Sequence, residues 1–197
     1  SDCVAIGSGA LVGALDSSDG TDEASRSIAI GSSALAALTS GAQNTAVGYT
    51  AMDELLTGDS NTAVGYAALH QIDAAEANNT AVGAGAGADL DGGSQNVFIG
   101  SSANGSGATA ANQIVIGYNT GGVADNSVTL GNADVTDIYM ASDMGANIRA
   151  DNAIILAQGL RFPDSQSASG DANQLDDYEE GDWTPTLTNI TIENGST

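Results

Sequence analysis

A five-residue segment that ends in glycine recurs eight times in the first two thirds of this chain. Three successive copies read NTAVG, at residues 44–48, 61–65 and 79–83. The closing glycines are separated by 24, 17, 17, 18, 17, 17 and 14 residues, and they are Gly7, Gly31, Gly48, Gly65, Gly83, Gly100, Gly117 and Gly131. A repeat of this length is typical of a solenoid, in which each copy forms one coil that stacks on its neighbours.

Each copy has the pattern of a short strand. The second and fourth positions carry threonine, valine, isoleucine or leucine, and the position between them is mostly alanine, as in Thr62, Ala63 and Val64. A period of two places the second and fourth positions on one face of the strand. We expect that face to point inward, with alanine keeping the other face thin. The predicted roll and trimer core is Val4, Ile6, Ile28, Ile30, Val47, Val64, Val82, Ile99, Ile116 and Leu130.

The rest of each copy is built for tight turns. The closing glycine allows a turn or a close backbone approach, because it has no Cβ. Polar segments rich in Gly, Asp, Asn and Ser complete each coil as loops. In the last copies Phe98, Val115 and Thr129 replace the alanine, which predicts that the roll widens or changes its packing as it ends. An alanine recurs three residues after the glycine: Ala10, Ala34, Ala51, Ala68, Ala86 and Ala103.

The composition predicts assembly of several chains. Only 4% of the 197 residues are aromatic, and much of the 42% hydrophobic content is alanine. A coil of this length offers only about two sizeable inward side chains, which is too little to close a core alone. Three chains packed around one axis would bury the inward side chains of all three together, so we expect a homotrimer. Seven steps of about 4.8 Å predict a rod roughly 34 Å long.

The charge excludes several classes of partner. The chain has 25 acidic residues against three arginines and no lysine, for a formal net charge of −22. This charge argues against binding to a nucleic-acid backbone or to an anionic membrane surface. No apolar run approaches the roughly 20 residues of a membrane span, so no membrane insertion is expected. A dense carboxylate surface also fits a halophilic host, because high salt screens its self-repulsion.

The repeats resemble those of a known family. SIAIGSSALA (27–36), NTAVGYTA (44–51) and NTAVGYAA (61–68) look like the head repeats of trimeric autotransporter adhesins of the YadA type, and the resemblance covers residues 3–131. It implies an all-β fold, a homotrimeric left-handed parallel β-roll, which is a form of β-solenoid. The same repeat occurs in tail fibres of tailed viruses. The long irregular segment 8–26 departs from the pattern.

We expect four regions along the chain. The β-roll takes residues 1–131, with about eight coils of period about 17. A β-rich neck follows at 132–163, where short alternating runs lack a fixed period. Residues 164–183 are polar and acidic, which predicts an extended linker. Residues 184–197 alternate again and are expected to start a further β domain, so we also expect flanking sequence beyond both ends of the chain.

A second resemblance favours a virus over a cell. LDDYEEGDWTPTL (175–187) resembles a segment of phage tail fibres and other virion proteins, and these 197 residues contain no heptads or membrane anchor. It implies an extracellular virion protein, a rigid spacer with an adhesive surface for host attachment. The implied partners are its own copies in a homotrimer, other virion tail proteins and a host surface glycan or surface-layer protein. The alternatives are a cell-surface trimeric adhesin head and a polysaccharide-degrading tailspike.

Three tyrosines are candidate glycan contacts. Tyr49, Tyr66 and Tyr118 each follow a repeat glycine directly. Tyr49 and Tyr66 fall on adjacent coils and are expected to stack about 4.8 Å apart on one face. Such rings serve either as a platform for sugars or as a structural ladder that covers the roll, and the pattern alone leaves both open.

We expect neither an enzyme nor a cofactor. The acidic residues at 176–180 are better explained as a solvated linker than as a catalytic pair, since nothing there buries a carboxylate. His70 with Asp73 lacks a marked nucleophile. No metal site is predicted. Asp16, Ser18, Gly20 and Asp22 alternate somewhat like a calcium loop, but the bidentate acid that closes such loops is absent, so Asp16, Asp19 and Asp22 are only weak candidates.

Overall fold

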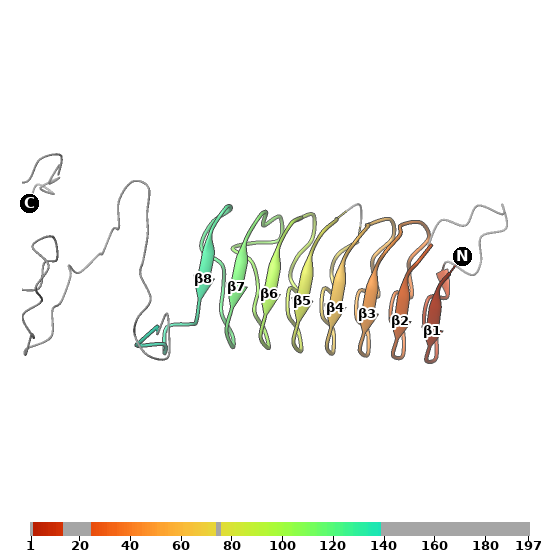
Figure 1. Ribbon diagram of the computed structural model, residues 1–197, viewed down its shortest axis with the longest axis horizontal. Coiled ribbons are helices and arrows are strands. Elements are labelled where there is room, and N and C mark those ends of the chain that lie inside the picture. Colours follow the sequence, from red (N-terminus) through yellow and green to blue (C-terminus); the bar gives the residue numbers. More distant parts are fainter. Residues whose placement is uncertain (1, 14–24, 74–75, 139–197) are drawn as a thin grey trace, which may run out of the picture. The chain divides into compact units, whose positions relative to one another are not determined.

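The protein is a parallel β-solenoid, seen in a computed structural model that describes residues 2–13, 25–73 and 76–138. Eight strands lie in a row in chain order and form one sheet, and no helix occurs in these ranges (Figure 1). The prediction of an all-β solenoid with a strand at every repeat is confirmed. The strands are β1 (Val4–Ile6), β2 (Ile28–Ile30), β3 (Thr45–Val47), β4 (Thr62–Val64), β5 (Thr80–Val82), β6 (Val97–Ile99), β7 (Ile114–Ile116) and β8 (Val128–Leu130).

Equivalent repeat positions pair with one another between neighbouring coils. Ala46 pairs with Ala63, and Ala63 pairs with Ala81, in parallel register. The backbone ladder continues into the closing glycines, since the N–H of Gly65 donates to the carbonyl of Val47 at 2.8 Å. The register is unchanged where the spacing is 18 instead of 17, so the extra residue is absorbed outside the strand.

The closing glycines stack on one another along the solenoid, at positions where a residue with a side chain would be strained and would clash. Seven of them, from Gly7 to Gly117, have φ between +128° and +149°, which L side chains rarely adopt. A Cβ built on Gly83 would lie 2.6 Å from the carbonyl oxygen of Gly100 in the next coil. The glycine at this corner therefore serves both the backbone conformation and the close approach of successive coils.

The strands face the opposite way from the prediction. The small middle residue points into the coil, and Ala46, Ala63 and Ala81 are fully buried. The alternate positions lie on the outer face, where Ile6 is 58% exposed and Val64 is 37% exposed. The predicted core residues therefore lie outside the core of the single chain: Val4, Ile6, Ile28, Ile30, Val47, Val64, Val82, Ile99, Ile116 and Leu130.

The actual core comes from rows that the strand pattern did not reveal. Leucine or a similar residue recurs four and seven positions after the glycine, and the alanine three positions after it is buried too. These side chains fill the coil against the strand alanines, so one chain closes an apolar core without a second copy. This corrects the expectation that a coil holds too little apolar volume. The row includes Leu35, Leu38, Met52, Leu55, Leu69, Ile72 and Leu90.

The late substitutions repack the core. Phe98 takes the place of a strand alanine and is fully buried. The neighbouring coil has Gly87 where earlier coils have Leu69 or Met52, and a Cβ on Gly87 would lie 2.7 Å from the Phe98 ring. The phenylalanine ring thus occupies the space that a leucine at 87 would need, and the predicted change of packing is found here.

Buried amides form a ladder at the start of the strands. Asn44, Asn61, Asn79 and Asn96 have no exposed surface. The Oδ1 of Asn61 accepts from the N–H of Asn79 at 3.0 Å and from its side-chain Nδ2 at 3.2 Å, and each neighbouring pair repeats this arrangement. Each Nδ2 also donates to a loop carbonyl, which is that of Gly93 for Asn79. The ladder satisfies buried polar groups and ties each loop to its strand.

Replacing Asn79 by alanine should lower the free energy of unfolding by about 1–3 kcal/mol, because the buried N–H and amide of Asn96 lose their acceptor. Urea denaturation followed by circular dichroism measures the change. The exposed amide of Gln71 provides the control, and Gln71→Ala should change stability by less than about 0.5 kcal/mol. Equal effects of the two variants would contradict a stabilising ladder.

The last described strand is β8. Residues 132–138, the first residues of the predicted neck, contain a turn at 133–134 and no strand. Backbone contacts divide the chain into the units Ser1–Tyr139 and Met140–Thr197. The remainder of the predicted neck (139–163), the linker (164–183) and the further domain (184–197) lie outside the described residues.

Candidate functional site

The outer face of the strands is uncharged and mostly aliphatic, with half-buried threonines at Thr45, Thr62 and Thr80. Its exposed side chains are aliphatic, with Val82 and Ile99 both 40% exposed. From β1 to β7, no charged residue lies in a strand or in the four residues that follow its closing glycine. We call the outer-pointing residues of β1–β8 the strand face. A chain of net charge −22 thus keeps one continuous surface without any carboxylate.

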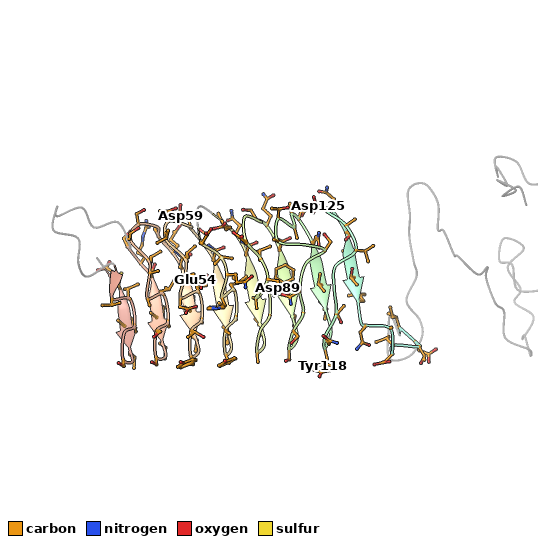
Figure 2. All side chains as sticks on the ribbon, turned by 180° about the vertical axis from the view of Figure 1, so that it is seen from behind. Glu54, Asp59, Asp89, Tyr118 and Asp125 are labelled. Atoms are coloured by element: carbon orange, nitrogen blue, oxygen red, sulfur yellow. The ribbon has the colours of Figure 1, made fainter. Side chains whose placement is uncertain are left out.

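The acidic residues of the described coils lie in the segments outside the strand face, and the coils at 31–44 and 100–113 have none. Figure 2 shows Asp59 and Asp125 at the edge of the solenoid opposite Tyr118, with Glu54 and Asp89 between these edges. This separation leaves two surfaces of different chemistry on one solenoid. In the described coils the acids of this part are Asp53, Glu54, Asp59, Asp73, Glu76, Asp89, Asp91 and Asp125.

The candidate tyrosines lie along the edge that follows the glycines. Tyr49 and Tyr66 stack with ring centroids 5.8 Å apart and planes 5° from parallel, which confirms the predicted stack. Their side chains stay exposed at 54% and 62%, and Tyr118, three coils further on, is 72% exposed. We call these three residues the tyrosine edge.

His70 pairs with residues that the sequence analysis did not select. Its Nδ1 lies 2.5 Å from Oδ1 of Asp53 and its Nε2 lies 3.8 Å from Oε1 of Glu54, both on the preceding coil. Asp73, three residues after His70 in the sequence, is not hydrogen-bonded to it. In the described residues, no hydroxyl is hydrogen-bonded to His70.

One acidic cluster has a spacing that suits a cation. Single carboxylate oxygens of Asp73, Glu76 and Asp91 lie within 4.8 Å of one another. Asp73 and Asp91 are exposed, and Glu76 is buried. Exposed acids commonly gather in this way without a metal ion, so the cluster alone assigns no site. The predicted calcium candidates Asp16, Asp19 and Asp22 lie outside the described residues, as do the acids at 176–180.

Asp125 supports the last loop electrostatically. The backbone N–H of Ala111 donates to its Oδ1 at 2.9 Å, and the Gln113 amide donates to the same oxygen at 3.0 Å. These hydrogen bonds, that from Ala111 first, lower the pKa of Asp125 below its ordinary value of 3.8. Gln113 continues the asparagine ladder, because its N–H donates to Oδ1 of Asn96. Its hydrogen bond to the ionised Asp125 carboxylate therefore holds the end of that ladder in place.

The lowered pKa predicts a pH dependence. A carboxylate whose pKa is lower in the folded state stabilises the fold above its unfolded pKa, and this contribution is lost as the pH falls through the folded pKa. Asp125→Asn should therefore destabilise the solenoid at neutral pH, and the difference should shrink as the pH falls below 3.8 and through the lowered folded pKa. Urea denaturation of both proteins across this range measures the difference. A difference that stays constant with pH would contradict the assignment.

Comparison of the chain with protein-family models, with curated proteins and with solved structures found no match. Within residues 2–13, 25–73 and 76–138, no helix is long and apolar enough to cross a membrane.

Proposed function

We propose that this protein is a structural and host-attachment module of a virion, a homotrimer of left-handed β-rolls that assembles through the strand face. The carrying observation is the strand face itself, an exposed row of aliphatic side chains without a charge in a chain of net charge −22. The exposed valine, isoleucine and leucine side chains of this face lower the free energy when a partner covers them.

A second copy of the chain suits this face better than an unrelated partner does. The face repeats with every coil, at a step of about 4.8 Å, and another copy offers the same step and the same row of side chains. Two copies that approach through their acidic parts would repel each other, because like charges face one another there. The uncharged strand face avoids that repulsion.

The number of chains and the biological setting rest on the sequence resemblance. The NTAVG copies resemble trimeric head repeats, and residues 175–187 resemble a segment of virion fibre proteins. On this proposal the solenoid is an extracellular spacer in a tail fibre. The neck, the linker and the further β domain join it to other tail proteins. The surfaces away from the trimer axis face the host glycan or surface-layer protein.

Immunogold electron microscopy with antibodies against the solenoid tests the setting. Samples of particles and of cells should come from the culture in which the protein is produced. The proposal predicts label on the fibres of free tailed particles and none on uninfected cells. Label on the envelope of uninfected cells would contradict it and would support a cell-surface trimeric adhesin instead.

A further inference from the structure

We propose that the tyrosine edge binds an uncharged polysaccharide by stacking sugar rings on exposed tyrosine rings. The inference rests on the proposed attachment function and names the chemistry of the ligand.

Folding does not require tyrosine at this position. The other coils place Ser8, Ser32, Ala84 and Ser101 directly after the closing glycine, and their strands pair in the same register. The three tyrosines are also more than half exposed, so burial in this chain does not account for them. A purely structural ladder explains Tyr49 and Tyr66, which stack on each other, but among the described residues Tyr118 stacks on no other ring.

The ring faces of the stacked pair look along the row of coils. Tyr49 and Tyr66 lie on adjacent coils with nearly parallel rings, so one face of Tyr66 is covered by Tyr49 and the other is turned toward the next coil. That coil and the one after it have only Ala84 and Ser101 at this position. Tyr118 follows three coil steps from Tyr66, a distance of about 14 Å. Small residues thus separate two aromatic residues on the same edge.

The surroundings favour a neutral carbohydrate. A sugar ring offers C–H groups to an aromatic face and hydroxyls to polar neighbours. Ser102 and Asn119 are exposed beside the edge and supply hydroxyl and amide groups, and from Gly7 to Gly117 no charged residue lies in the four residues after a closing glycine. The net charge of −22 would repel an anionic polysaccharide. Stacking on uncharged rings therefore selects uncharged sugars.

Titration calorimetry of the full chain with a set of neutral hexaoses (cellohexaose, mannohexaose and hexa-N-acetylchitohexaose) tests the proposal, with hexagalacturonate as the acidic probe. At least one neutral hexaose should bind, and hexagalacturonate should not. Tyr66→Ser and Tyr118→Ser introduce the residue that other coils carry and should each weaken binding roughly tenfold. Tyr66→Phe keeps the ring and should retain binding within about twofold.

Three binding results would overturn the proposal. These are failure of every neutral hexaose to bind, equal binding by the serine variants, or tighter binding of hexagalacturonate. Light scattering of the same samples shows whether a loss of sugar binding comes from the tyrosine edge itself or from a loss of trimer assembly. If the serine variants lose assembly, the tyrosine edge belongs to the contact between subunits and the glycan assignment is wrong. If the wild-type chain binds sugar as a monomer, the glycan assignment is supported and the proposed trimer is contradicted.

Discussion

Replacing Gly83 by alanine is expected to lower the free energy of unfolding by about 2–6 kcal/mol. Two costs add at this residue. Its φ of +138° is strained for any residue with a Cβ, and the new methyl would lie 2.6 Å from the backbone of Gly100. Backbone cannot move aside as a flexible side chain does, because each coil is held in register by its neighbours. Urea denaturation at a fixed protein concentration measures the loss.

Gly107→Ala is the matched control for this prediction. A Cβ at Gly107 meets nothing within 4 Å, and its φ lies outside the left-handed region. The same chemical change should therefore alter stability by no more than about 0.5 kcal/mol. If Gly83→Ala were as harmless as Gly107→Ala, the backbone conformation and the close approach of coils at this corner would not require glycine.

Replacing Val64 by aspartate is expected to abolish assembly while leaving the single chain folded. Val64 points outward from β4 and is 37% exposed, so the new carboxylate stays hydrated in a monomer. In the proposed trimer three carboxylates would meet within an apolar contact, and such like-charge contacts cost several kcal/mol. The dissociation constant should rise at least about a hundredfold. Sedimentation measures the mass, and circular dichroism measures the fold.

Gln71→Asp adds the same charge away from the strand face and should leave assembly unchanged. Gln71 is exposed in the acidic part of its coil, beside His70 in sequence. If Val64→Asp unfolded the chain, the assignment of the outer face would be wrong. If Gln71→Asp dissociated the protein as well, net charge rather than the strand face would govern assembly.

The repeat was sufficient to predict the solenoid and its strands. A glycine at near-constant spacing determines where each coil turns, and all eight predicted strands are found. The inward face was predicted wrongly because alternation shows that Thr62 and Val64 share a face but not whether that face is inside. The residues that decide which face is buried lie on the opposite side of the coil. Leu69 and Ile72 recur there with their equivalents and fill the interior, which leaves room for only a methyl group from Ala63.

The candidate sites were predicted in part, where equal repeat positions on neighbouring coils bring two residues together. The stack of Tyr49 on Tyr66 followed from their equal repeat positions and is present. The same reasoning applied to His70 leads one period back to Asp53, its actual partner, although only Asp73 was considered beside it from the sequence. The asparagine ladder also repeats at a fixed position. Its burial was not foreseen, because amides are usually exposed unless they are hydrogen-bonded.

Light scattering of the full 197-residue chain tests the central claim most directly. One chain has a mass of 19.4 kDa, and the account predicts a particle of three times that mass that does not dissociate on dilution into the low micromolar range. A folded particle of 19.4 kDa at all concentrations would show that the strand face stays open to solvent, and would contradict the account.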